Sequence, residues 1–187
     1  MLRPIQKTPT THSPRYFARP DYPIVFGCTP KCGSTTVQRT ARREGFRQVT
    51  ELEALCFNDK RVVLVVREPF ARLRSAYIYF VAENARAPHG MCPQNRFRNM
   101  RFSEFVQFTL DKPNYHWTPQ TFQHEHWREF ELWPLPKLNE LWPAELGTPL
   151  WEKRTGDWTV EGEEFTPQLR EHYAEDIEMY EQATHTL

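Results

Sequence analysis

The sequence predicts an α/β fold in which helices flank a central parallel sheet. Two short apolar runs, residues 24–28 and 61–66, have the composition of buried strands. A helical pattern follows each run, and this alternation of strand and helix is typical of parallel sheets. The chain has 187 residues with 14% aromatic side chains, which is enough to build one sizeable core.

The composition also limits what kind of protein this is. Aromatic residues are too frequent for a disordered chain, and no apolar run approaches the ~20 residues of a membrane helix. Residues 1–22 are rich in Pro and polar side chains and lack the apolar core of a signal peptide. We therefore expect an extended or disordered arm over 1–22, a single domain over 23–187, and a cytoplasmic protein with no membrane partner.

The net charge of zero hides an asymmetry between the two halves of the chain. Residues 1–103 contain 18 Lys and Arg against 7 Asp and Glu, whereas residues 104–187 contain 6 against 17. A basic first half indicates an anionic ligand such as a phosphate, a sulfate or a nucleic acid. The alternative is that the two halves simply pair with each other.

The cysteines give little functional information. They are scattered without a Cys-x-x-Cys pair, which favours free thiols in a reducing compartment over a disulfide. A zinc site is not expected either, because His124 and His126 are closer together than zinc-ligand histidines usually are. The four cysteines are Cys28, Cys32, Cys56 and Cys92.

The first half of the chain contains the clearest elements. After the strand at 24–28, a helix is expected from Ser34, a natural N-cap, to Gly45, a natural stop. The strand at 61–66 leads to Pro69, which suits the first position of a helix. Apolar residues then recur at helical spacing as far as Val81.

The second half is less regular. We expect a loop over 84–101, a short helix over 102–110, irregular structure over 111–136 and a helix over 137–146. The last helix is the clearest of these, because Thr166 provides an N-cap directly before a proline and an apolar stripe.

The turn after the first strand is a candidate anion site. Its sequence, Thr-Pro-Lys-Cys-Gly-Ser-Thr-Thr over 29–36, opens a helix, and free amides at a helix N-terminus attract anions. Gly33 allows the backbone to approach an anion, Lys31 adds a positive charge, and the following hydroxyls can donate hydrogen bonds. The alternative is an ordinary strand-to-helix turn.

This P-loop-like turn differs from that of the nucleoside triphosphatases. Gly27 and Gly33 are six residues apart rather than five, and Lys31 precedes the second glycine. The Pro-Lys-x-Gly-Ser-Thr order instead resembles the 5′-phosphosulfate loop of sulfotransferases that use 3′-phosphoadenosine 5′-phosphosulfate (PAPS). The resemblance implies the P-loop-like sulfotransferase fold and these cofactor-binding residues: Pro30, Lys31, Cys32, Gly33, Ser34, Thr35 and Thr36.

A second motif follows the strand at 61–66. Arg67 stands at the strand end, and Ser75 lies in the second turn of the helix behind it. A guanidinium fork and a hydroxyl suit a phosphate, although a strand-end arginine can also be solvated or pair with Glu68. The segment resembles the family's 3′-phosphate site, Arg-x-Pro-x-x-Arg-x-x-Ser-x-Tyr, which implies that Arg67 and Ser75 bind the 3′-phosphate of PAPS or of its product, 3′,5′-adenosine bisphosphate (PAP).

Two later segments point to one branch of that family. Residues 115–120, Tyr-His-Trp-Thr-Pro-Gln, resemble the His-Trp-x-Pro-Gln element of the Golgi carbohydrate O-sulfotransferases of the chondroitin and heparan group. The stretch from Tyr173 through Asp176 to Tyr180 resembles the Tyr-x-x-Asp-x-x-x-Tyr ending common there. The resemblance implies transfer of a sulfuryl group from PAPS to a hydroxyl, with a carbohydrate as the expected acceptor.

Two residues are the candidate catalytic groups. Sulfuryl transfer needs a base for the acceptor proton and a cation at the bridging oxygen of the leaving phosphate. The usual histidine pKa of ~6.5 suits a base, so His116 is our hypothesis, and Lys31 is assigned to the bridging oxygen. His116 can equally be structural, and Glu51, Glu53 and His89 are the other candidate bases.

Other features carry weaker expectations. Arg154 is a candidate late cofactor contact, although it can equally be a solvated surface residue. The arginines of the 86–101 segment could bind an anionic acceptor, or they could be solvated or paired with acidic side chains. The tryptophans, all between 117 and 158, favour core packing over sugar stacking. The rival functions are a P-loop-type nucleotide or small-molecule kinase and a non-catalytic module that binds nucleotide or nucleic acid. We expect no nucleic-acid partner, because the second half is acidic.

Overall fold

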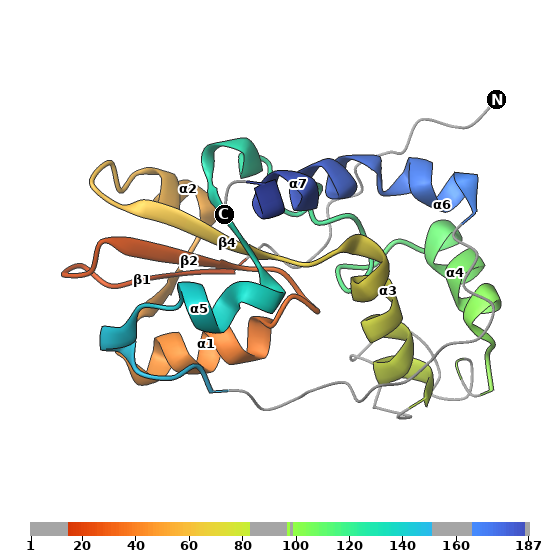
Figure 1. Cartoon of the computed structure of the whole chain (residues 1–187), viewed down its shortest axis with the longest axis horizontal. Helices are drawn as coiled ribbons and strands as arrows, with labels where there is room; N and C mark the ends of the chain where they lie inside the picture. The colour runs from red at the N-terminus through yellow and green to blue at the C-terminus, as the bar shows by residue number, and fades with distance from the viewer. Residues whose placement is uncertain (1–14, 83–96, 98, 151–165, 186–187) are drawn as a thin grey trace.

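The computed structural model describes residues 15–82, 97, 99–150 and 166–185. A five-stranded sheet with the strand order β3-β1-β2-β4-β5 runs through the molecule, and helices cover both of its faces (Figure 1). The α/β class predicted from the sequence is therefore confirmed.

The sheet is mixed rather than wholly parallel. Strands β2 (Ile24–Cys28), β4 (Arg61–Val66) and β5 (Glu131–Pro134) run parallel to one another, as expected for the first two. Strand β1 (Arg15–Ala18) is antiparallel to both of its neighbours, β2 and β3 (Arg47–Val49). The expectation of a parallel sheet is thus correct for one side of the sheet and wrong for the other.

Strand β1 also corrects the N-terminal boundary. The expected arm over 1–22 is wrong from Arg15 onward, because Tyr16 and Phe17 are fully buried in the sheet. The strand is only four residues long and lies between prolines, so its sequence has no strand-length pattern. Residues 1–14 lie outside the described part of the chain.

Helix α1 (Ser34–Arg43) follows β2 as predicted, with shifted ends. Gly33, rather than Ser34, is the N-cap, and the helix ends before Gly45, which has a φ of 79°. Gly33 has a φ of 71°, and a Cβ atom there would lie 2.7 Å from Leu135 Cδ1. Glycine is required at this position for both reasons.

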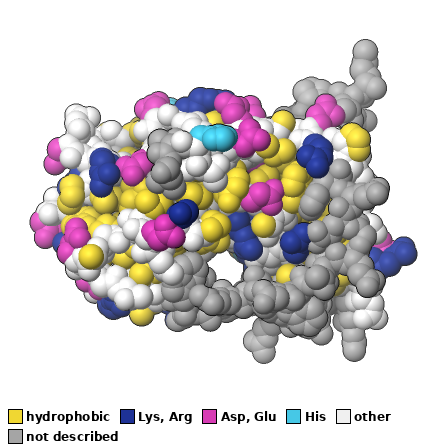
Figure 2. All heavy atoms as spheres, in the orientation of Figure 1, with side chains coloured by type: hydrophobic (Ala, Val, Ile, Leu, Met, Phe, Trp, Pro, Cys, Tyr) yellow, Lys and Arg dark blue, Asp and Glu magenta, His cyan; other side chains and the backbone are white. Residues whose placement is uncertain are grey.

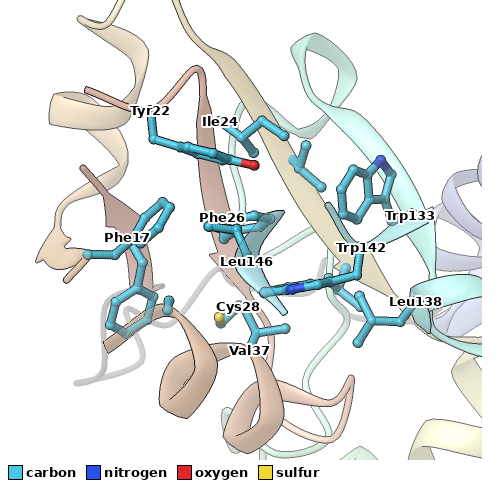
Figure 3. Close-up of a cluster of buried hydrophobic side chains, with 14 residues drawn as sticks. Phe17, Tyr22, Ile24, Phe26, Cys28, Val37, Trp133, Leu138, Trp142 and Leu146 are labelled. Atoms are coloured by element: carbon cyan, nitrogen blue, oxygen red, sulfur yellow. The ribbon is translucent and has the colours of Figure 1, made fainter. Parts of the chain in front are cut away.

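One face of the sheet packs on α1 and α5 (Leu138–Leu141). Successive residues of β2 and β4 point to opposite faces, so Phe26 and Val65 meet Val37 of α1 on this side. Figure 3 shows the ring of Trp142 beside that of Phe26, and the two rings stack with centroids 4.7 Å apart. This cluster fixes the start of α1 against the ends of the strands.

The other face is covered by α2 (Glu51–Leu55) and α7 (Ala174–His185). Leu64 of β4 packs there with Ala54 of α2 and Met179 of α7. Neither β3 nor α2 is predicted from the sequence, since each is at most five residues long. The signal for α2 lies in its capping box, in which the Thr50 hydroxyl accepts from the Glu53 amide and the Glu53 carboxylate accepts from the Thr50 amide.

A third cluster of apolar side chains lies beyond the ends of β2 and β4, at the right of Figure 1. It joins α3 (Pro69–Tyr77), a π-helical turn (Ile78–Ala82), α4 (Phe102–Asp111) and α6 (Pro167–His172). Helices α3, α4 and α6 begin where the sequence predicts. The predicted last helix is divided at Tyr173 into α6 and α7.

The segment predicted to be irregular contains β5, which completes the sheet. The predicted helix over 137–146 is only partly helical, because α5 is a single turn. Short 3-10 helices lie at Trp127–Glu129, Leu135–Lys137 and Ala144–Leu146.

Four of the six tryptophans are buried, which confirms that these four belong to the core. The buried tryptophans are Trp117, Trp127, Trp133 and Trp142, whereas Trp151 and Trp158 lie outside the described residues.

None of the helices in the described part combines the length and the apolar character needed to cross a lipid bilayer.

Candidate active site

The turn between β2 and α1 has the backbone geometry of an anion site. Lys31, with a φ of 68°, and Gly33 are both in the left-handed region, which is uncommon for a residue other than glycine. The first helical hydrogen bond runs from the Val37 amide to the Gly33 carbonyl at 3.0 Å, so the amides of residues 34–36 precede the helical ladder. The first turn of α1 carries no acidic side chain, so the helix dipole favours an anion here.

The second motif lies directly against this turn. Arg67, at the end of β4, donates from Nη1 to the Lys31 carbonyl at 3.1 Å. Arg72, on α3, donates from Nε to the Pro30 carbonyl at 2.9 Å. Because β2 and β4 are parallel neighbours, their carboxyl ends meet at one edge of the sheet. The two motifs predicted to share one ligand are therefore adjacent in space.

Arg72 is a site residue whose role the sequence does not reveal. Its side chain is only 1% exposed, and its guanidinium also donates to the carbonyls of Thr118 at 2.8 Å and Tyr115 at 3.1 Å. It therefore ties the anion turn to the segment that contains His116. A buried cation of this kind is stable because several acceptors surround it.

Lys31 and His116 approach the same aromatic ring. The Lys31 ammonium lies 3.6 Å from the centroid of Tyr79 and 5.7 Å from that of Phe80. The His116 ring contacts Phe80 edge to face, with centroids 4.9 Å apart. Tyr79 and Phe80 belong to the π-helical turn after α3, a distortion that is frequent at functional sites. The two candidate catalytic residues thus converge from different segments.

The other predicted site residues differ in their surroundings. Ser75 is buried on α3, and Thr35 is exposed at the start of α1, whereas Thr36 is buried. Cys32 does not face outward: its thiol donates to Gln120 Oε1 at 2.9 Å, and its amide donates to the Thr29 carbonyl. Both polar groups of Cys32 therefore shape the turn itself.

The alternative bases lie elsewhere or outside the described part. Glu51 begins α2, where burial raises its pKa and one carboxylate oxygen accepts from the His126 amide at 3.2 Å. Glu53 is occupied in the capping box of α2, and its bonds to Thr50 lower its pKa. His89 and the candidate cofactor contact Arg154 lie outside the described residues.

The thiols agree with the expectation from the sequence as far as the structure describes them. Cys28 and Cys32 are buried and Cys56 is exposed, and all three are free thiols. Burial raises the pKa of the Cys32 thiol to about 11, so it stays neutral in the turn. Cys92 lies outside the described residues.

Comparison with known families decides which family the chain belongs to. The family model described as the sulfotransferase family matches residues 14–141, more than half of the chain. The chain belongs to the sulfotransferase family. The match begins beside β1 and includes the anion turn, Arg67, Ser75 and His116. Comparisons of the sulfotransferase with curated proteins and with solved structures gave no significant match.

The sulfotransferase surface is hollowed next to these residues. Figure 2 shows Lys and Arg side chains beside an opening near the middle of this face. A pocket of about 350 Å³ adjoins the side chain of Arg67. Burial lowers the pKa of Arg67 from its ordinary value, yet an arginine remains charged under such conditions. The pocket is lined by Arg67, Glu68, Ala71, Leu135, Pro136, Asn139 and Tyr180.

A buried histidine of the sulfotransferase is hydrogen-bonded to the first residue of the anion turn. His124 is fully buried, with Nδ1 2.6 Å from the Tyr16 hydroxyl and Nε2 2.8 Å from Thr29 Oγ1. The sequence drew attention to His124 only for its spacing from another histidine. In the structure, the His124 ring links Tyr16 of β1, 108 positions away in the sequence, to Thr29, the first residue of the turn, 95 positions away.

We expect His124 to make the fold sensitive to acid. Burial lowers the pKa of His124 from 6.5 to about 3. Between these values the unfolded chain binds the proton and the folded chain does not, so stability is present above pH 6.5 and is lost as the pH falls. The loss at pH 5 is about 2 kcal/mol relative to pH 7. Urea unfolding at both pH values gives the free energy of unfolding, which should fall less between pH 7 and pH 5 in His124→Gln than in the unsubstituted chain. An equal fall in the two proteins would contradict the assignment.

Proposed function

We propose that this sulfotransferase transfers the sulfuryl group of PAPS to a hydroxyl of a carbohydrate. The observation that carries the proposal is the hydrogen bond from Arg67 Nη1 to the Lys31 carbonyl at 3.1 Å. It joins two segments that, by resemblance, contact opposite ends of one doubly phosphorylated adenosine. A binder of a single phosphate would need only one of them.

The residues present suit such a donor in a P-loop-like arrangement. The amides that precede the helical ladder of α1 suit the 5′-phosphosulfate, and Ser34 and Thr35 add hydroxyls beside them. The side chains of Arg67 and Ser75 suit the 3′-phosphate, since a guanidinium pairs with two phosphate oxygens at once. The absence of acidic side chains from the first turn of α1 avoids repulsion of an anion at this position.

Lys31 and His116 would act on the reacting groups. The Lys31 ammonium would stabilise the charge that develops on the bridging oxygen as the bisphosphate leaves. The His116 imidazole would accept the proton of the attacking hydroxyl. Their shared contact with Phe80 supports these roles, because it brings both side chains to one side of the anion turn. The likeness of the 115–120 and 173–180 segments to those of carbohydrate sulfotransferases supports a carbohydrate acceptor.

Thermal unfolding with different ligands tests the proposal. A ligand present at 100 times its Kd adds ~2.7 kcal/mol to the stability of the folded state. We expect PAP to raise Tm at concentrations at which ATP with Mg²⁺ and duplex DNA do not. A larger shift with ATP and Mg²⁺ would indicate a kinase, and salt-dependent DNA binding without a preference for PAP would indicate a nucleic-acid binder. Either result would overturn the proposal.

A further inference from the structure

Between the anion turn and the end of β4 lies a fully buried amide, that of Gln120. Its Oε1 accepts from the Cys32 thiol at 2.9 Å and from the Arg67 amide at 3.1 Å. Its Nε2 donates to the Arg67 carbonyl at 2.8 Å. One side chain therefore bonds both candidate nucleotide-binding segments, and it extends the hydrogen bonding of β4 by one residue.

Gln120 is itself held from the opposite side by Asp176 of α7. The Asp176 carboxylate is fully buried and accepts from the Gln120 amide at 2.7 Å and from Gln120 Nε2 at 3.3 Å. Its other oxygen accepts from the amide and the hydroxyl of Thr121, at 2.9 and 3.1 Å. The Asp176 carboxylate thus accepts from four donors on two consecutive residues, and these bonds fix the position of Gln120 in the folded structure.

We propose that Gln120, fixed by Asp176, is a positioning residue that sets the separation of the two phosphate sites. The inference rests on the proposed function, which assigns those sites to the anion turn and to Arg67. Neither side chain takes part in a catalytic or binding step of the proposed function, although Gln120 shares the 115–120 segment with His116. A ligand that bridges two sites gains affinity only when their spacing matches its own, so a small shift of one segment weakens bridging. A ligand that occupies one site is insensitive to the spacing.

The test compares a bridging ligand with two ligands that cannot bridge. In Gln120→Met, which keeps the side-chain length and removes its hydrogen bonds, the affinity for PAP should fall by about tenfold or more. The affinities for adenosine 5′-monophosphate and adenosine 3′-monophosphate should change by less than about threefold. Isothermal titration calorimetry of the full chain gives all three constants. Gln107→Met is the matched control, because Gln107 is exposed on α4 and bonds Asp111.

A milder pair of variants covers the case in which Gln120→Met does not fold. Cys32→Ala removes the donor to Gln120, whereas Cys32→Ser has nearly the same volume and retains a donor. The preference for PAP over the two monophosphates should fall about two- to tenfold in Cys32→Ala, the range for one hydrogen bond, and return in Cys32→Ser.

The possible outcomes separate this inference from the proposed function. If the unsubstituted chain binds PAP no more tightly than the monophosphates, the proposed function fails and the inference fails with it. If the unsubstituted chain prefers PAP but Gln120→Met weakens all three ligands alike, or none, the positioning role alone is overturned. The same holds if Cys32→Ala and Cys32→Ser behave identically in a chain that prefers PAP.

Discussion

Replacement of Lys31 by alanine should lower kcat for sulfuryl transfer by ~10²–10³-fold, the usual cost of removing one donor to a developing negative charge. The charge on the bridging oxygen grows as the bond to sulfur breaks, so the ammonium stabilises the transition state more than the bound donor. The structure holds that ammonium 3.6 Å from the centroid of Tyr79, beside the anion turn. The loss in kcat should therefore exceed the loss in affinity for PAP.

The measurement is the release of PAP from PAPS with a panel of glycan acceptors, read as kcat. Lys137→Ala is the matched control, because Lys137 is exposed on the 3-10 helix before α5 and bonds Glu140 at 3.0 Å. A Lys31→Ala enzyme with a kcat within about threefold of the unsubstituted chain would remove Lys31 from the reaction.

The second large effect concerns His116. His116→Ala should lower turnover by ~10²–10⁴-fold, because the acceptor hydroxyl then loses its base. Added imidazole should restore part of the activity, since it can enter the space left by the side chain and accept the proton. A histidine that only supports Phe80 or Tyr115 would not give this rescue.

His126→Ala provides the control for this experiment. His126 is partly exposed and lies 3.4 Å from the Glu129 carboxylate, so its loss should leave turnover nearly unchanged. Normal turnover in His116→Ala would eliminate the base assignment. Lost turnover without rescue by imidazole would favour the structural role that the sequence also allows.

The parts of this protein that are local in sequence could be predicted from it. The strands at 24–28 and 61–66 are continuous apolar runs, and Ser34, Pro69 and Thr166 mark the starts of helices, although the N-cap of the first helix is Gly33 rather than Ser34. The anion turn is equally local, because one stretch of eight residues supplies both its amides and its charges. The sequence does not predict β1, β3 or β5, because strands of three or four residues have little hydrophobic pattern of their own.

The contacts that hold the site together could not be predicted in the same way. Arg72 reaches Pro30 across 42 positions, and Gln120 reaches Asp176 across 56. Nothing in the spacing of these residues indicates such pairs, because a buried polar side chain finds its partner only when the chain has folded. Resemblance drew attention to the segments that contain Gln120 and Asp176 but not to the bonds between them.

By itself, the sequence determined the two strand-turn-helix units and the chemistry that each presents, since hydrophobic periodicity and helix capping act within a few residues. Only the tertiary structure decided that these units share one edge of a mixed sheet, and that Arg72, Gln120, His124 and Asp176 fix them there. The physical reason is that a buried charge or amide must satisfy its hydrogen bonds with whatever groups folding brings near, and these lie 42 to 108 positions away.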